Sequence, residues 1–282
     1  MDCKPIDLWD VSTYDKSLSG FLHEHVDLIR RFHETENRLF LEYDHGPNRG
    51  GFEPRPVNPY CAAYRRLEED IAADLRERTI RAFHYSRLTD GEVGTLRHDG
   101  IHLSTPETFC ARLAARAAEG LLTPADVETI HAASPIHHQR KMRSGMFWMT
   151  SHPIGPDSSA VSELLGHWGG EVTYMWLREP PLVAKLQVLG RPRIIEIAAP
   201  LSATRDAPNA ATTALRAFAL SLGCVVHKHG IDLCAVQQLP PPVILAVHTE
   251  GDSAFHAMGR DYPAGYVDTD LCWWKALTGE DD

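Results

Sequence analysis

The chain has 282 residues, of which 43% are hydrophobic and 23% are charged, and its formal net charge at pH 7 is −10. A chain of this kind can bury one large core or two small ones. Its net negative charge argues against a protein whose whole surface binds nucleic acid. The basic, His-rich run 137–143 could still form a local basic patch that does so. No apolar run approaches the roughly 20 residues that a membrane span needs, so we expect no membrane partner.

The first 79 residues read as a helical accessory region. Apolar residues at helical spacing across 18–40 predict one amphipathic helix. The segment 44–59 holds three Gly and four Pro, so it should form a loop, a hinge or a lid. A second helix is expected over 60–81, before the catalytic part of the chain.

The stretch 81–105 has the clearest local organisation. A strand should run to Leu88, Thr89 can cap the helix that follows, and Gly100 suits the position just after the helix end. Residues 101–103 then resume an extended run. His84 would therefore lie on a strand, with the neighbouring Tyr85 pointing to the opposite face.

The remaining chain alternates helix and strand signals. Two Thr-Pro pairs predict consecutive helices over about 105–133, and short or long helices are expected at 158–165 and 210–222. Strands are expected at 146–149, 171–177, 182–189, 193–198 and 243–248, from β-branched, aromatic and apolar content. The pattern predicts an α+β protein: a helical N-terminal region followed by a mixed or antiparallel sheet.

The common catalytic signatures are missing: there is no Walker loop, no GxGxxG after a strand, no HExxH and no GxSxG. The six cysteines are scattered without a CxxC pair, and we expect no leader peptide. A reduced, cytoplasmic setting is the simplest interpretation. What remains is a set of polar residues beside strand-like aromatic sequence, in the segments 84–87, 148–151 and 169–171.

The segment FHYSRLTDGEVGTLRHDGIHLST, residues 83–105, resembles the first strand and following helix of the ADP-ribosyltransferase superfamily. In that family a strand His or Arg binds the ribose of NAD, the position that His84 matches. Residues 147–151, Phe-Trp-Met-Thr-Ser, are similar to the second motif, which holds the nicotinamide. The third motif is a glutamate, matched best by Glu171 after two glycines; Glu196 and Glu250 are the alternatives.

The resemblance implies an ADP-ribosyltransferase-like catalytic domain over 80–282 that uses NAD as a co-substrate. It would be a transferase of the glycosyltransferase type, moving ADP-ribose to a macromolecular acceptor, either protein or nucleic acid. The family's ExE or QxE pair is absent, which makes a nucleic-acid base or end at least as good an acceptor as an arginine. By analogy the protein would be a bacterial toxin, effector or defence component, with an antitoxin or immunity partner.

The chemistry needs few groups. Nicotinamide is a cationic leaving group, so a carboxylate that stabilises positive charge on the ribose is sufficient, and His84 and Glu171 would be the catalytic residues. Aromatic rings can stack on nicotinamide and hydroxyls can bond its carboxamide. The NAD-binding residues would be His84, Tyr85, Ser86, Trp148, Thr150, Ser151 and Tyr174, with no metal.

Other interpretations stay open. His84 and Trp148 could be core residues, and Glu171 could be a surface carboxylate at a strand edge. A metal-dependent hydrolase could use His227 and His229, or His98 and His102. A non-enzymatic interaction module could bind a partner through the adjacent residues Trp273 and Trp274.

Overall fold

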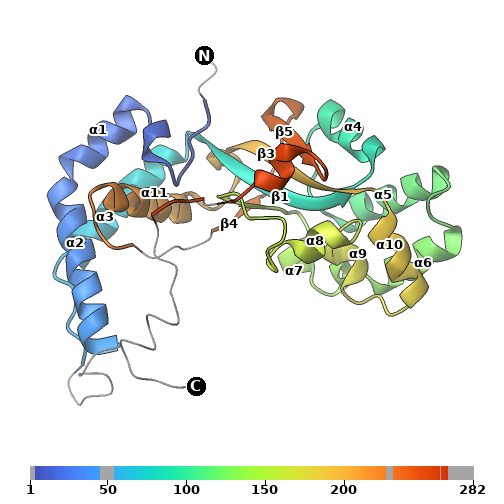
Figure 1. The fold of residues 1–282 in the computed structure, drawn as a ribbon, viewed down its shortest axis with the longest axis horizontal. Coiled ribbons are helices and arrows are strands. Elements are labelled where there is room, and N and C mark those ends of the chain that lie inside the picture. Colours follow the sequence, from blue (N-terminus) through green and yellow to red (C-terminus); the bar gives the residue numbers. More distant parts are fainter. Residues whose placement is uncertain (1–3, 45–53, 227–230, 261, 266–282) are drawn as a thin grey trace. The chain divides into compact units, whose positions relative to one another are not determined.

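The computed structural model describes residues 4–44, 54–226, 231–260 and 262–265. The chain forms two compact units (Figure 1). The helical unit contains Ile6–Arg78 and Asp206–Ile231, and the sheet unit contains Thr79–Arg205 and Asp232–Tyr262. The segment 206–231 therefore belongs with the N-terminal helices, which differs from the single catalytic span 80–282 expected from the sequence.

The described residues of the helical unit form four longer helices: α1 (Lys16–Glu24), α2 (Val26–Leu39), α3 (Cys61–Leu75) and α11 (Ala207–Ser221). Two short turns accompany them, η1 (Val11–Thr13) and η2 (Phe40–Asp44). The single helix expected over 18–40 is broken at His25, whose φ of −110° and ψ of 14° are not helical. Its imidazole Nδ1 bonds the carbonyl of Phe21 instead, 2.9 Å away.

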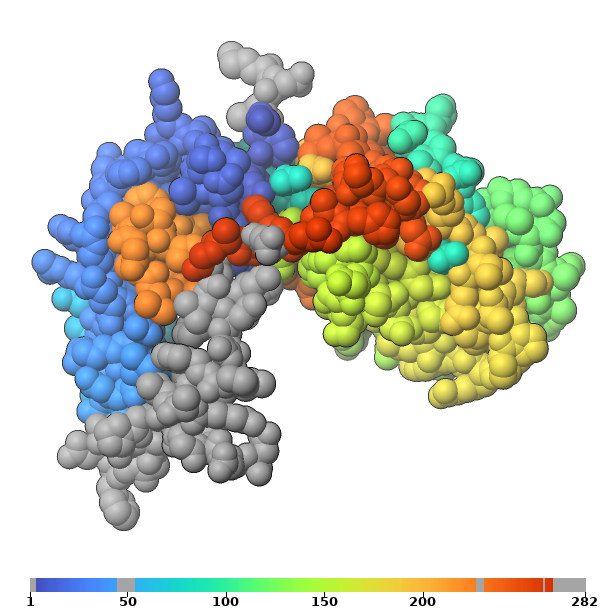
Figure 2. All heavy atoms as spheres, in the orientation of Figure 1, coloured from blue at the N-terminus to red at the C-terminus, as the bar shows by residue number. Residues whose placement is uncertain are grey.

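Small side chains let α11 pack tightly in this unit. Ala210, Ala211 and Ala214 are fully buried, and α3 contributes the buried Leu67 and Ile71. Figure 2 shows the blue N-terminal helices and the orange α11 as one packed body. The unit thus has a core of its own, formed by segments far apart in the sequence.

The described residues of the sheet unit form a five-stranded antiparallel sheet in the order β4-β2-β1-β3-β5. Its strands are β1 (Thr79–Leu88), β2 (Phe147–Thr150), β3 (Arg191–Pro200), β4 (Asp232–Ala235) and β5 (Ile244–Thr249). The central β1 pairs with β3 along its whole length, from Thr79 opposite Pro200 to Leu88 opposite Arg191. The α+β class expected from the sequence is confirmed at this level.

The sheet unit also contains helices between its strands in the sequence and after the last of them. They are α4 (Asp90–Asp99), α5 (Pro106–Ala118), α6 (Pro124–Ala133), α7 (Arg140–Arg143), α8 (Ser162–Gly166), α9 (Glu171–Tyr174), α10 (Pro180–Val188) and α12 (Ser253–Ala257), with short turns η3 (Pro135–His137), η4 (Leu201–Ala203) and η5 (Pro241–Val243). Capping boxes at Thr89, Thr105 and Thr123 start α4, α5 and α6, as the sequence predicted. In Figure 1, α5, α6, α9 and α10 lie together, around a buried cluster that includes Trp168.

Two expected strands are wrong. Residues 171–174 form the helix α9, and 180–188 form the helix α10. Pro180 and Pro181 occupy the first turn of α10, where proline favours a helix, and Leu182 and Leu186 are buried one turn apart. The β-branched and aromatic content of these segments favours strands, but the glycines before α9 and the prolines at the start of α10 favour helices there.

Several other elements predicted from the sequence are confirmed. Strands formed near 147–150, 191–200 and 244–249, and helices over the 105–133 region and 207–221. Residues 101–103 pair only through one isolated bridge, from Ile101 to Leu239. No helix among the described residues is both long enough and apolar enough to cross a membrane. Cys61, Cys110 and Cys224 are free thiols.

Candidate functional site

His84 lies in the middle of the central strand β1. Its ring is half-buried and lies 4.4 Å, centroid to centroid, from the ring of Phe147 on β2. The imidazole Nδ1 is 2.8 Å from the carbonyl oxygen of Trp148. The side chain is therefore held by two residues of the neighbouring strand.

The partner of His84 determines its tautomer. A carbonyl oxygen can only accept, so Nδ1 must carry the proton, and in the neutral ring Nε2 is then an acceptor. Burial lowers the pKa of His84 to about 4; the hydrogen bond to Trp148 acts in the opposite direction, and the charge of Arg112 adds to the lowering. The imidazole is consequently neutral at pH 7.

Trp148 connects this position to α7. Its indole Nε1–H donates to the carbonyl oxygen of Met142, 3.3 Å away. The guanidinium of Arg205 lies 5.7 Å from the ring centroid of Trp148. The side chain is 42% exposed, so part of the ring is open to solvent or to a ligand. It is not a core residue.

Glu171 is the first residue of the helix α9, and not a strand-edge residue. Gly169 and Gly170 before it have φ values of 79° and 62°. A Cβ at Gly169 would meet Thr173 Cγ2 at 2.4 Å, so that glycine is needed for the tight turn itself. The Glu171 carboxylate pairs with Arg143 Nη1 at 2.5 Å, and its side chain is 41% exposed. Because Arg143 follows Met142 in α7, this short helix connects Glu171 to Trp148 and thus to His84.

Tyr174 lies on the same short helix as Glu171. Its ring stacks on His167 with centroids 4.4 Å apart and planes 22° from parallel. Burial raises the pKa of Tyr174, and the charges of Glu163 and Glu171 add to this effect. Tyr174 is therefore next to Glu171, but its ring already has a stacking partner.

The other expected NAD-binding residues do not all gather around His84. Tyr85 is 3% exposed and points to the opposite face of the sheet, where its hydroxyl bonds the backbone of Ile154 at 2.5 Å and 3.1 Å. Thr150 donates to the carbonyl of His152 at 2.8 Å. Ser151 is buried, and buried Ser86 shares the face of His84 by strand alternation. Tyr85 is thus a core residue and is not available for stacking on nicotinamide.

The two alternative glutamates lie elsewhere. Glu196 is opposite Phe83 in the β1–β3 register, whereas His84 is opposite Ile195, so Glu196 and His84 face opposite sides of the sheet. Arg81 holds the Glu196 carboxylate at 2.7 Å, and His248 holds it at 3.1 Å. Burial acts to raise the pKa of Glu196, but the hydrogen bonds and charges of these two partners outweigh it. Glu250 is exposed in a turn after β5.

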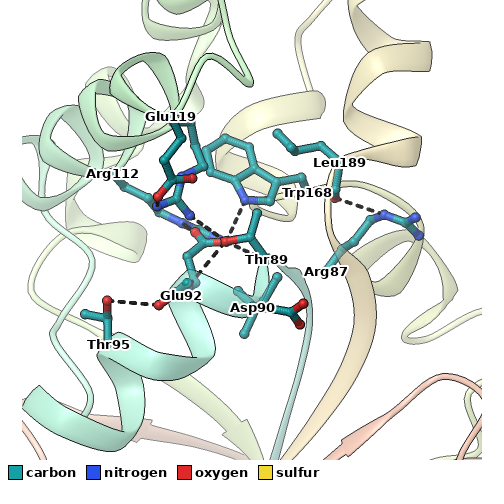
Figure 3. Close-up of polar contacts among 12 residues, drawn as sticks. Arg87, Thr89, Asp90, Glu92, Thr95, Arg112, Glu119, Trp168 and Leu189 are labelled. Carbon is teal, nitrogen blue, oxygen red and sulfur yellow. Dashed lines mark hydrogen bonds and ion pairs between the residues drawn. The ribbon is translucent and has the colours of Figure 1, made fainter.

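A buried ionic network around Glu92 was missed by sequence reasoning (Figure 3). Arg112 Nε lies 2.5 Å from Glu92 Oε1, and Trp168 Nε1 donates to Oε2 at 2.8 Å. Arg116 is 3.2 Å from the same carboxylate, and the N–H of Thr89 is 2.8 Å from it. Burial acts to raise the pKa of Glu92, but Arg112 and the other donors outweigh it and the carboxylate stays charged.

This network joins several elements of the sheet unit. It ties the start of α4 to α5 and to the turn before α9, and the Arg112 guanidinium also lies 4.6 Å from the Trp168 ring centroid. Glu92 was visible in the sequence only as the fourth residue of the Thr-x-x-Glu capping signal. Its side-chain partners come from residues 20 to 76 positions away, which no local pattern reveals.

The alternative functions receive no support from the described residues. Within them, no group of three or more His, Cys, Asp or Glu side chains could hold a metal ion. The candidate ligands His227 and His229, and the pair Trp273 and Trp274, lie outside the described residues. Comparisons of the chain with protein-family models, with curated proteins and with solved structures found no match.

Proposed function

We propose that the sheet unit transfers ADP-ribose from NAD to a macromolecular acceptor, as an ADP-ribosyltransferase-like enzyme. The observation that carries the proposal is the connection from a neutral strand histidine, through Trp148 and α7, to Glu171. This chain of contacts joins residues from the three motifs of the sequence resemblance, which are 64 and 23 positions apart in the chain, and it supports the proposal.

Each residue has a chemical role in this proposal. His84 accepts a hydrogen bond from a ribose hydroxyl at Nε2, because Nδ1 already donates to the carbonyl oxygen of Trp148. The ring of Phe147, on the same face of the sheet as His84, shelters the nicotinamide ring, whereas Trp148 alternates with Phe147 and has its ring on the other face. The bond between the ribose C1′ and the nicotinamide nitrogen breaks, and its electron pair leaves with nicotinamide. Glu171 stabilises the positive charge that develops on the ribose, and an acceptor nucleophile then bonds C1′ and loses its proton.

The acceptor is a protein or a nucleic acid, and the surroundings of Glu171 favour an acidic surface on it. Arg140 and Lys141 are exposed on α7, directly before the residues that bond Trp148 and Glu171. Cations beside a transfer site attract a phosphate backbone or an acidic protein segment. A role as a toxin, effector or defence component, with an antitoxin or immunity partner, belongs to the same proposal.

The test is nicotinamide release from NAD by the purified chain, with RNA or cell extract as acceptor. Glu171→Gln keeps the shape of the side chain and removes its charge; we expect release to fall by at least about 100-fold, as for the loss of an electrostatic catalytic group. His84→Ala should weaken NAD binding and release together.

Matched variants control for general effects. Glu163→Gln changes an acid that also lies near Tyr174 and is 63% exposed, and His98→Ala changes a histidine that is 87% exposed. Both should leave release unchanged. Loss of release in His84→Ala but not in Glu171→Gln would move the carboxylate role to another residue, and no release with no NAD binding would refute the function.

A further inference from the structure

The helical unit contains a cavity of about 390 Å³ that the proposed transfer reaction does not use. It is lined by α2, η2, α3, α11 and the residues just after α11, all within this one unit. The lining residues that matter below are Phe32, Phe40, Tyr64, Arg65, Glu68 and Arg216. A volume of this size is in the range of about 300–1,000 Å³ that is typical of small-molecule sites.

One wall of the cavity is flat and aromatic. The rings of Phe32 and Tyr64 stack with centroids 3.7 Å apart and planes 8° from parallel. Tyr64 is 4% exposed, and its hydroxyl is 3.0 Å from Nε2 of His33. The stack and the hydrogen bond hold the wall rigidly, and Phe40 and Val226 add further apolar surface. Such a wall suits a planar, apolar ligand body.

The cavity also contains a cation without an anionic partner. Arg216 is half-buried, and its guanidinium makes no hydrogen bond or ion pair with any described residue. Arg65, at the exposed edge, likewise has none within the described chain. A guanidinium has five N–H donors, and leaving them unsatisfied in a partly desolvated place costs free energy.

The neighbouring groups do not compensate for Arg216. Burial lowers the pKa of His33 to about 4, and the Arg216 charge adds to this, so His33 is neutral at pH 7. Glu36 is bonded to Arg55 and to Asn58, and Glu68 accepts a hydrogen bond from Thr212 at 3.0 Å. Glu36 is thus engaged by a cation and Glu68 by a neutral hydroxyl, and neither carboxylate is bonded to Arg216.

We propose that this cavity binds a small organic carboxylate with a planar apolar body, its carboxylate paired with Arg216 and its ring against the Phe32–Tyr64 stack. Guanidinium and carboxylate match in a bidentate geometry, and the aromatic wall supplies the apolar contact. None of the lining residues takes part in the proposed transfer reaction.

The experiment compares two probes of nearly equal shape on the full chain. Phenylacetate carries the carboxylate, and 2-phenylethanol replaces it with a neutral group. We expect phenylacetate to bind at least about tenfold more tightly, the ratio that a charge-assisted hydrogen bond of about 1.5 kcal/mol supplies. Ligand-observed NMR measures both affinities. In spectra of the protein, phenylacetate should also shift the ring signals of His33.

Variants locate the charge that makes the difference. Arg216→Gln should remove the preference for phenylacetate, whereas Arg66→Gln, an exposed arginine on α3 outside the lining, should keep it. Equal binding of the two probes by the unaltered chain would overturn the proposal without any variant. A preference that persists in Arg216→Gln would overturn it as well. Neither result depends on whether the chain consumes NAD.

Discussion

The Nδ1 atom of His84 and the carbonyl oxygen of Trp148 lie 2.8 Å apart, across the gap between the central strand and its neighbour. This contact assigns the proton of the neutral ring to Nδ1 and leaves Nε2 as an acceptor. The two residues are 64 positions apart, so the contact exists only in the folded chain.

His84 should be neutral at pH 6 in the folded protein. Its folded pKa of about 4 is below the ordinary histidine value of 6.5, mainly because burial disfavours the charged ring. The unfolded state therefore binds more protons between pH 6.5 and 4, and the free energy of unfolding should fall as the pH is lowered through that window. Nitrogen-15 NMR of the ring checks the charge state, and urea unfolding at several pH values checks the stability.

His84→Gln provides the control, because it removes this titration. Its free energy of unfolding should fall less steeply between pH 6.5 and 4 than that of the unaltered chain. A ring that is already cationic at pH 6 would contradict both this prediction and the role of Nε2 as an acceptor.

Glu92→Gln should destabilise the sheet unit strongly. The carboxylate is 11% exposed and faces two arginines, so its loss leaves buried positive charge uncompensated, at a cost of about 3 kcal/mol or more. Glu119→Gln removes a partner of Arg116 that is 43% exposed and should cost less than about 1 kcal/mol. Urea unfolding measures both losses in free energy of unfolding. A loss for Glu92→Gln as small as that for Glu119→Gln would show that the network contributes little stability.

Gly190 and Gly120 form a matched pair in the same unit, because both have a φ of 73°. A Cβ at Gly190 would lie 2.5 Å from the carbonyl carbon and oxygen of Leu88, whereas nothing lies within 4 Å of one at Gly120. Gly120→Ala should cost about 1–2 kcal/mol for the left-handed backbone alone. Gly190→Ala should cost a further 1–3 kcal/mol or so from the clash. Thermal unfolding that ranks them in the reverse order would refute the geometry of the turn before β3.

Arg143→Gln tests how Glu171 is held. Arg143 pairs with this carboxylate at 2.5 Å, so its removal should lower the rate of nicotinamide release by about tenfold through loss of orientation, with the affinity for NAD unchanged. Arg143→Lys should restore part of the rate. Arg140→Gln, in the same short helix, should have little effect on nicotinamide release measured without an acceptor. A fall in NAD affinity instead would place Arg143 on the phosphates of NAD.

Short-range features of the fold were predictable from the sequence. The starts of α4, α5 and α6 depend on Thr side chains bonding backbone three residues ahead, so the pattern Thr-x-x-Glu or Thr-Pro predicts them. The strands expected at 171–177 and 182–189 were wrong, because the composition of these segments favours strands while glycine and proline determine their backbone. The break at His25 left no clear pattern, since it rests on a contact with a residue in the preceding turn.

The composition of the candidate site was only partly predictable. The sequence by itself determined that His84 lies on a strand and that a capped helix follows, because both depend on neighbouring residues. The tertiary structure decided which groups meet: strand register placed Glu196 on the face opposite His84, α7 connected Trp148 to Glu171, and two arginines closed around Glu92. The physical reason is range, since register and buried ion pairs join residues that are far apart in the chain and leave no periodic trace in it.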